Sequence, residues 1–235
     1  MVSAVQPSPE TLATMELFEG LPSLALEAVA AAARLRRLPR ELRIFGQGDV
    51  DVRAHAVIEG AVRITQSGGD GAQVIIRFIG PGEMFGTVAL FTDRRYPADA
   101  ITITETLEAS WSEAELLDLI HKHPQLGVNV IRIIGKHLQE VQERVRELAT
   151  QSAERRVAHA LLRLARQAGH GTNDGTVIDF PLRRKDVADI AGTTLHTASR
   201  ILTAWEKLGL LVSHNQHLTI RQPAQILRIA EDGPD

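Results

Sequence analysis

Six apolar residues between positions 131 and 148 recur at alternating steps of three and four, and this spacing constrains the chain more than any other feature. They are Ile131, Ile134, Leu138, Val141, Val145 and Leu148. Such spacing places one narrow apolar stripe along an α-helix, as in the seam of a coiled coil. The sequence therefore predicts a long helix that pairs with a second copy in a parallel homodimer. The alternative is a long helix packed along its own domain.

The segment before this helix, from about Leu42 to Trp111, has a different texture. Short β-branched runs such as HAVIEGAVRITQS and AQVIIRFIG alternate with glycine-rich turns such as SGGDG. Closely spaced short strands of this kind indicate an antiparallel roll or barrel. Helical patterns within residues 11–34 precede the roll, and Pro22 and Ser23 open the second of them. Ser112 with Glu115 predicts a capping box directly after it.

The segment after the long helix predicts a helix-turn-helix followed by a hairpin. SAERRVAHALLRLARQAGHG reads as a helix and TVIDFPL as a short strand. Within RRKDVADIAGTTLHTASRILTAWEKLG, Gly192 can adopt the left-handed conformation of a turn, and Thr193 or Thr194 can cap the second helix. The first helix should bury Val187, Ile190 and Ala191. LLVS and HLTIR, around Asn215–Gln216, predict a two-stranded wing.

The second helix of this motif has two unlike faces when it is rotated by 100° per residue. One face is apolar: Leu195, Ala198, Ile201, Leu202 and Trp205. The other is polar, holds no carboxylate that could pair with Arg200, and carries His196, Ser199, Arg200 and Thr203. Because a guanidinium can bond both O6 and N7 of guanine, we expect Arg200 to read a base in a major groove. The expected contacts to double-stranded DNA are Arg200, Ser199, His196, Thr194, Thr197 and Lys185.

Composition narrows the class of protein. The net charge is −3, but residues 152–221 hold 10 Lys and Arg against 6 Asp and Glu, which weakly indicates a polyanionic partner. The chain has no cysteine, which excludes disulfides, thiolate nucleophiles and cysteine-held iron–sulfur clusters. It also has no run of 18 apolar residues and no signal-peptide pattern, so we expect a soluble, cytoplasmic protein without membrane contact.

The order of roll, long helix and winged helix-turn-helix resembles the Crp/Fnr superfamily of bacterial transcription regulators over essentially the whole chain. PGEMFGTVALF, ERRVAHALLRLA and RKDVADIAGTTLHTASRIL carry the resemblance. It implies an α+β fold with a cyclic-nucleotide-binding-like antiparallel β-roll as sensor domain (1–123), a dimerisation helix (124–151) and a winged helix-turn-helix domain (152–235).

The resemblance also implies a two-fold symmetric operator of the TTG…CAA kind, with Arg200 on the guanine. Many members carry Glu at the position of His196, so the base read there is expected to differ. RNA polymerase is an expected partner, and Glu83 and the loop 92–97 are candidates to touch either the polymerase or the DNA-binding domain.

The roll decides which branch of the superfamily the chain resembles. Cyclic-AMP-binding members carry a Glu where this chain has Thr87, and an Arg-Ser pair where it has Pro97–Ala98. Cyclic nucleotide is therefore an unlikely effector, and an iron–sulfur cluster is excluded. TTLHTASR and ALFTDRRYPADA look most like the nitric-oxide-responsive NnrR and DNR regulators, which implies haem. The candidate axial ligands are His55, His121, His123, His137 and His159; the candidate effector pocket is Gly82, Glu83, Phe85, Thr87, Arg94, Arg95 and His55.

Two other functions remain as alternatives. A regulator that needs no ligand would use the roll only as a scaffold. A cupin-like metalloenzyme would need several converging His or Glu ligands, and His55 is the only histidine between Leu42 and Trp111. We therefore expect no enzymatic activity, and no metal ligand can be assigned from the sequence.

Overall fold

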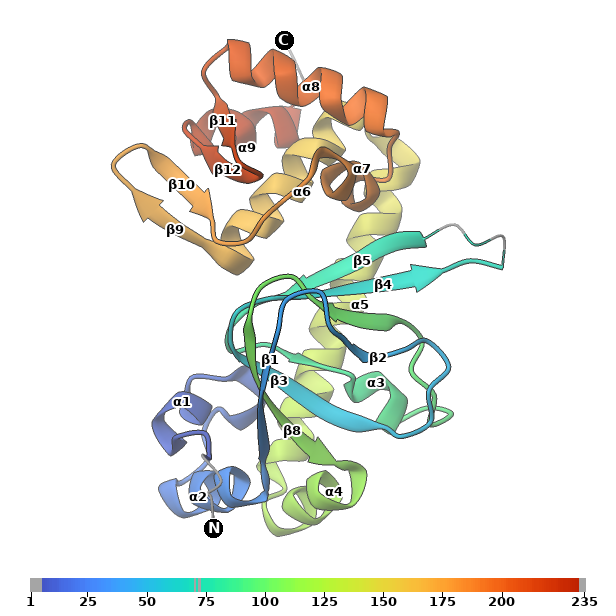
Figure 1. Cartoon of the computed structure of the whole chain (residues 1–235), viewed down its shortest axis with the longest axis vertical. Helices are drawn as coiled ribbons and strands as arrows, with labels where there is room; N and C mark the ends of the chain where they lie inside the picture. The colour runs from blue at the N-terminus through green and yellow to red at the C-terminus, as the bar shows by residue number, and fades with distance from the viewer. Residues whose placement is uncertain (1–5, 70, 72, 233–235) are drawn as a thin grey trace. The chain divides into compact units, whose positions relative to one another are not determined.

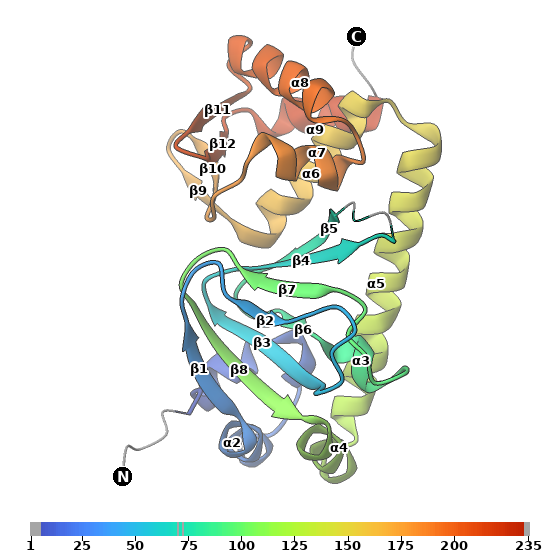
Figure 2. The same cartoon turned by 45° about the vertical axis from the view of Figure 1, so that its right-hand side comes forward.

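Two antiparallel four-stranded sheets form the roll in the computed structural model, which describes residues 6–69, 71 and 73–232. One sheet has the order β1-β8-β3-β6 and the other β2-β7-β4-β5 (Figures 1 and 2). The strands are β1 (Arg34–Leu38), β2 (Arg43–Phe45), β3 (Arg53–Glu59), β4 (Val62–Ser67), β5 (Gln73–Ile79), β6 (Met84–Phe85), β7 (Asp99–Thr102) and β8 (Thr106–Ser112). The predicted roll is confirmed. Asp70 of the predicted SGGDG turn, Ala72 at the start of the predicted strand AQVIIRFIG, residues 1–5 and residues 233–235 lie outside the described residues.

Short helices surround the roll in the same unit. They are α1 (Pro9–Ala13), the 3-10 helix η1 (Glu16–Phe18), α2 (Ser23–Ala32), α3 (Thr87–Leu90) and α4 (Glu113–Lys122). The predicted capping box opens α4: the Ser112 hydroxyl accepts from the Glu115 N–H, and the Glu115 carboxylate accepts from the Ser112 N–H. Trp111 anchors the N-terminal helices, since its indole N–H donates to the carbonyl of Val29 and its ring lies edge-on to Phe18.

The register of β1, β8 and β3 gives the first sheet two different faces. Arg36 lies opposite Glu108, which lies opposite Val57, while Ser110 lies opposite His55. Successive side chains alternate between faces, so Ala109 and Trp111 turn to the other side, toward the N-terminal helices. The roll interior is therefore lined by the polar face of this sheet.

The sequence did not predict β1. The helix α2 ends at Ala32, although the helical pattern in the sequence extends beyond it. The strand that follows, RLRRL, contains three arginines, which gave no strand signal. Pairing with β8 forms the strand, since tertiary hydrogen bonds override weak local preference.

The long helix α5 runs from Gln125 to Thr150 without interruption. It is followed by a second set of elements: α6 (Ala153–Ala168), β9 (Gly169–Thr172), β10 (Gly175–Ile178), α7 (Arg184–Ala191), α8 (Leu195–Lys207), β11 (Leu211–His214), β12 (His217–Ile220) and α9 (Pro223–Asp232). The strands form a sheet of order β11-β12-β10-β9 (Figure 2). The predicted wing is confirmed, with Asn215 and Gln216 at positive φ in its two-residue turn.

Contacts divide the chain into two compact units, and the division falls within α5. The first unit runs up to Gln73 and resumes from Phe78 to Glu140; the second holds Val74–Arg77 and the chain from Val141 on. Among the described residues, no helix combines the length and apolar character needed to cross a membrane.

Candidate nucleic-acid interface and roll interior

The turn between α7 and α8 is built from local backbone chemistry. The N–H of Arg183 donates to the carboxylate of Asp186 at the start of α7. The helix ends at Gly192, whose φ of 62° is left-handed, and the Thr193 N–H then donates to the carbonyl of Ala188. The Thr194 hydroxyl accepts from the Thr197 N–H, at 3.2 Å, and opens α8. The predicted helix-turn-helix is confirmed, with Thr194 as the cap.

The buried face of α8 is close to the prediction. Ala198, Ile201, Leu202 and Trp205 are buried, and the Trp205 indole N–H donates to Glu154 of α6 at 3.0 Å. Leu195, which rotation places on the same apolar face, is not buried, because its side chain is 51% exposed. Leu195 is the first residue of α8, and helical side chains lean toward the N-terminus. It therefore projects past the packed part of the helix.

The exposed face of α8 presents Arg200 without an internal partner. His196 and Arg200 are exposed, and Ser199 is half-buried. Arg200 makes no hydrogen bond or ion pair with any residue that the structure describes. Its guanidinium keeps all of its donors available to a ligand.

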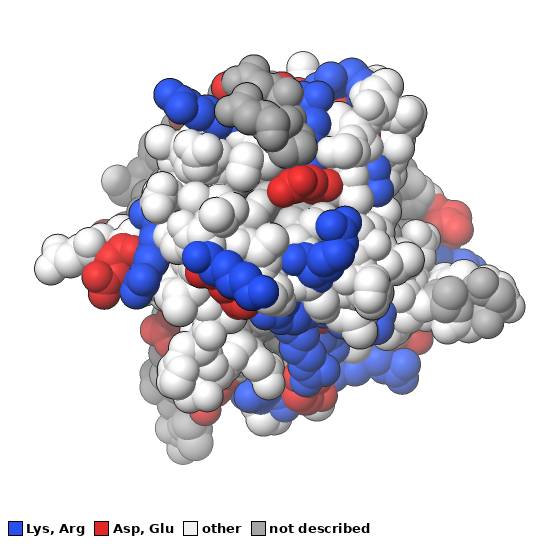
Figure 3. Space-filling model, turned by 90° about the horizontal axis from the view of Figure 1, so that it is seen from above, with Lys and Arg blue, Asp and Glu red and all other residues white. Residues whose placement is uncertain are grey.

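Five of the ten Lys and Arg side chains in residues 152–221 are bound within this unit: Arg155, Arg156, Arg163, Arg184 and Lys185. Arg184 donates to the Ser199 carbonyl at 2.8 Å and to the Glu206 carboxylate at 2.8 Å, and Lys185 pairs with Asp189 at 2.9 Å. Basic side chains are spread among neutral ones at the end of the molecule that carries α8 (Figure 3). Internal bonding therefore accounts for half of these cations, and Arg200 is one of five exposed ones without such a bond among the described residues, with Arg166, Arg183, Lys207 and Arg221.

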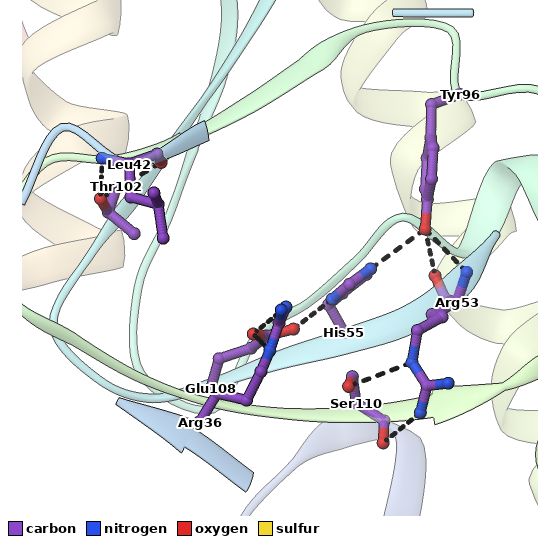
Figure 4. Close-up of polar contacts among 8 residues, drawn as sticks. All are labelled: Arg36, Leu42, Arg53, His55, Tyr96, Thr102, Glu108 and Ser110. Carbon is purple, nitrogen blue, oxygen red and sulfur yellow. Dashed lines mark hydrogen bonds and ion pairs between the residues drawn. The ribbon is translucent and has the colours of Figure 1, made fainter. Parts of the chain in front are cut away.

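The roll interior contains a buried polar network (Figure 4). Glu108 is fully buried, and its carboxylate accepts two hydrogen bonds from the Arg36 guanidinium, at 3.0 and 2.7 Å. The other carboxylate oxygen contacts Nδ1 of His55, which is 3% exposed. On the far side of the ring, Nε2 lies 3.1 Å from the hydroxyl of Tyr96. A buried charge thus has two partners, as burial requires.

The Tyr96 hydroxyl contacts both the backbone of Arg53 and the His55 ring. The Tyr96 oxygen accepts from the Arg53 N–H at 2.7 Å and donates its single proton to the Arg53 carbonyl at 3.1 Å. The same oxygen lies 3.1 Å from Nε2 of His55, so one hydroxyl joins the ring to the backbone of Arg53. Burial raises the pKa of Tyr96 to about 12, which keeps the phenol protonated.

Aromatic rings fill the space around His55. Phe45 stacks on Tyr96 with ring centroids 3.6 Å apart, and Phe85 lies 5.0 Å from the His55 ring. Gly86 lies close to the same ring: an added Cβ would come within 2.8 Å of His55 Cδ2. The side chains of the roll itself therefore occupy the space around His55.

The candidate effector residues fall into three groups. His55 and Phe85 come together in the interior, as just described. Arg94 and Arg95 are exposed: Arg94 pairs with Glu113, and Arg95 donates to the carbonyl of Gly48. The remaining candidates lie in the connection around β6: Gly82 at positive φ, Glu83 accepting from the Gly80 N–H, and half-buried Thr87.

Sequence reasoning missed the other members of the interior network: Arg36, Phe45, Arg53, Tyr96, Glu108 and Ser110. One signal was available in the sequence, the carboxylate of Glu108 in TLEASW. Strand alternation places it on the face of the sheet that does not carry Ala109 and Trp111. Whether that face is inside depends on the second sheet, which local sequence does not reveal.

The histidines considered as haem ligands are dispersed. Both ring nitrogens of His55 have partners, Nδ1 of His121 lies 3.3 Å from the Leu117 carbonyl, and His159 lies near Glu147. Burial lowers the pKa of His159, although Glu147 raises it. In the described part of the chain, no three His, Cys, Asp or Glu side chains are grouped to hold a metal ion.

The predicted seam of α5 is a line of exposed apolar side chains. Their exposed fractions range from 47% for Leu148 to 72% for Ile131, and the whole set is Ile131, Ile134, Leu138, Val141, Val145 and Leu148. The opposite side of the first half of α5 is packed, because Asn129 is buried and donates to the carbonyls of Leu17 and Glu19.

Comparisons with known proteins agree with this architecture. Residues 35–123 match the cyclic nucleotide-binding domain, and residues 155–229 match the Crp-like helix-turn-helix domain. The cyclic AMP receptor protein of Thermus thermophilus is 28% identical over 91% of this chain and 96% of its own length. The nitrogen fixation regulation protein FixK of Azorhizobium caulinodans is 29% identical over 86% of this chain and 82% of its own length.

A solved structure, FixK2 from Bradyrhizobium japonicum, is similar in fold, with a TM-score of 0.73 over 83% of this chain and 96% of that chain at 23% identity. The two matched domains stand in the order that defines a family of regulators rather than enzymes. The chain belongs to the Crp/Fnr family of DNA-binding transcription regulators.

Proposed function

We propose that the chain binds a two-fold symmetric operator of the TTG…CAA kind, with α8 in the major groove and Arg200 on the guanine. The observation that supports this most strongly is the exposed guanidinium of Arg200, which has no partner among the described residues, whereas Arg184 and Lys185 of the preceding helix are bound internally. His196 and Ser199 lie on the same face and would contact adjacent base edges or phosphate. Thr194 and Thr197 at the N-terminus of α8 would meet phosphate, where backbone N–H groups favour anions.

Lys185 is the weakest of the proposed contacts. Its ammonium group is exposed but already pairs with Asp189, so binding a phosphate would require it to exchange one anion for another. It would contribute charge near the duplex rather than a positioned contact.

A homodimer through α5 is the second part of the proposal. Six exposed apolar side chains on one helix form a stripe that water solvates poorly, and the heptad spacing fits a copy of the same helix. A pair of subunits would present two copies of Arg200 to two half-sites, which matches a palindromic operator. Such a regulator would act in the cytoplasm and contact RNA polymerase; Glu83 and the loop 92–97, whose residues are exposed except for Tyr96, remain candidates to touch the polymerase or the DNA-binding domain.

For the effector, the roll interior supports a regulator that does not use cyclic nucleotide. The name of the Thermus relative states that it receives cyclic AMP. This chain has Thr87 and Pro97–Ala98 at the positions of the phosphate-binding residues, and its own rings and the pair of Glu108 with His55 fill the interior. We therefore propose that the roll acts as a scaffold without a cyclic nucleotide.

A haem-linked response to nitric oxide is the alternative that the sequence resemblance implies. His55 would have to release Glu108 or Tyr96 before it could bind iron. Titration of the full chain with haem, followed by absorption spectra with and without nitric oxide, separates the two. A saturable band that shifts with nitric oxide would overturn the scaffold proposal, and an unchanged haem spectrum supports it.

The DNA proposal is tested by selection from a pool of random duplexes. The full chain should enrich a palindrome with a guanine in each half-site. Arg200→Ala should weaken binding by about tenfold or more and relax the choice of that base, since a bidentate pair is worth about 1–3 kcal/mol of discrimination. Arg166→Ala, which removes an exposed arginine of α6, is the control. Equal enrichment by wild type and Arg200→Ala would contradict the assignment.

A further inference from the structure

One guanidinium of α6 bonds three backbone carbonyls around the turn that precedes α8. Nε of Arg156 donates to the carbonyl of Ala191 at 2.9 Å, and Nη2 donates to that of Gly192 at 3.0 Å. Nη1 donates to the carbonyl of Gln151 at 2.7 Å, between α5 and α6. The same side chain therefore joins the segment after α5 to the turn before α8.

The acceptors on α7 belong to the end of that helix, where carbonyls lack intrahelical partners. Such carbonyls carry the negative end of the helix dipole, so a cation placed there is favourable. Arg144 of α5 supports the same end, with Nη2 3.5 Å from the carbonyl of Asp189. The end of α7 is thus held by two arginines.

An apolar contact accompanies these bonds. A Cβ added to Gly192 would lie 2.4 Å from Cδ2 of Leu148, so the last turns of α5 pack directly on the left-handed glycine. No larger residue fits at Gly192 without displacing Leu148. The turn is consequently fixed from two sides, by Leu148 of α5 and by Arg156 of α6.

We propose that Arg156 is a positioning residue for DNA recognition: it sets the turn, and so the placement of α8, without contacting DNA. The inference rests on the proposed DNA function. Lysine cannot replace the arginine, because an ammonium group lacks the planar fork that reaches three carbonyls. A phosphate contact, by contrast, would tolerate lysine, since both cations neutralise a phosphate.

The experiment measures the affinity of the full chain for its selected operator duplex over salt concentrations from about 50 to 200 mM. The slope of log affinity against log salt counts the phosphates that the protein neutralises, and it changes by about one for each lost contact. We compare wild type with Arg156→Gln and Arg156→Lys. Arg166→Gln, on the same helix and without a partner among the described residues, is the matched control.

Both Arg156 variants should bind about tenfold or more weakly with an unchanged slope and an unchanged oligomeric state, and Arg166→Gln should bind like wild type. Wild-type affinity in Arg156→Lys, or a slope reduced by about one in Arg156→Gln, would identify a phosphate contact and overturn the inference. Unchanged affinity in Arg156→Gln would overturn it as well. Trp205 fluorescence reports whether each variant is folded; if Arg156→Gln is unfolded, Arg156→Lys decides.

The failure of the proposed function is distinguishable from that of the inference. If wild type binds no duplex, the DNA proposal fails and the role of Arg156 falls with it. If wild type binds and only Arg200→Ala is without effect, the base assignment fails while the Arg156 comparison still decides its own question.

Discussion

The two units of this chain place their ionisable side chains in opposite ways. The roll buries them: Glu108 and His55 lie in its interior, and Arg36 reaches in from the edge strand to pair with the carboxylate. In the DNA-binding unit, Arg155 and Arg156 bond carbonyls at the ends of α9 and α7. Arg200 on the exposed face of α8 makes no such bond among the described residues and is available to a ligand.

This difference shows that the net charge of a segment does not identify a binding surface. The positive balance of residues 152–221 indicated a polyanion, but half of the ten Lys and Arg side chains in that segment bond within the unit. Buried charges should matter far more to the stability of the roll than the exposed ion pairs matter to the second unit. The chain offers a convenient reporter for each, Trp111 in the roll and Trp205 in the second unit.

The largest effect is expected from Glu108→Ala in the roll. Removing the carboxylate leaves His55 and Arg36 without their partner inside the roll. Breaking a buried pair in this way lowers the free energy of unfolding by about 3–5 kcal/mol. Denaturant unfolding followed by Trp111 fluorescence, in a Trp205→Phe background, measures the loss. Glu105→Ala, which removes an exposed carboxylate paired with Arg37, is the control and should change little. A loss for Glu108→Ala as small as that of the control would refute the comparison.

Tyr96→Phe should have a smaller effect on the same unit. The hydroxyl satisfies His55 Nε2 and both backbone groups of Arg53, and leaving buried groups unpaired costs about 1–3 kcal/mol. The same unfolding measurement applies. A variant as stable as wild type would mean that water replaces the hydroxyl without loss.

The single tyrosine of the chain also permits a direct titration. Because its pKa is raised to about 12 in the folded protein, tyrosinate absorbance should appear near that pH, against about 10 in the denatured chain. The sign follows: raising the pH above about 10 favours the unfolded chain, where the phenol ionises first. Tyr96→Phe should show no such absorbance change. A native midpoint near 10 would show that the phenol is accessible.

A smaller effect is expected from Glu206→Ala in the second unit. The Arg184–Glu206 pair is partly exposed, so its loss should cost less than about 1 kcal/mol. Trp205 fluorescence in a Trp111→Phe background reports the change. A loss comparable to that of Glu108→Ala would show that the second unit also depends on its ion pairs.

The smallest effect concerns His159. Burial lowers its pKa, so the neutral ring is favoured in the folded unit, and protonation favours unfolding. The contribution of the neutral His159 ring to the free energy of unfolding of the second unit should be fully present above the ordinary pKa of about 6.5. It should decline as the pH falls below that value. His159→Gln should remove this part of the pH dependence. An identical pH profile in the variant would assign the decline to other groups.

The helix-turn-helix was predictable because each of its signals is local. Gly192 ends α7, Thr194 caps α8 and Asn215–Gln216 closes the wing, and each depends on backbone chemistry within a few residues. The exposure of Leu195 was not predictable in this way, since rotation around a helix axis assigns a face but not how far along the axis the packing extends.

The sequence by itself determined the order of elements, the local turns and caps, and the apolar stripe of α5, since all of these follow from spacing along one chain. Only the tertiary structure decided that β1 joins β8, that Arg36, Glu108 and His55 meet inside the roll, and that Arg156 reaches the turn of α7. These contacts join residues that are distant in sequence or lie on different elements, and their existence depends on strand register and helix packing. Charge balance can be read from a sequence, but the partner of each charge is fixed only by the fold.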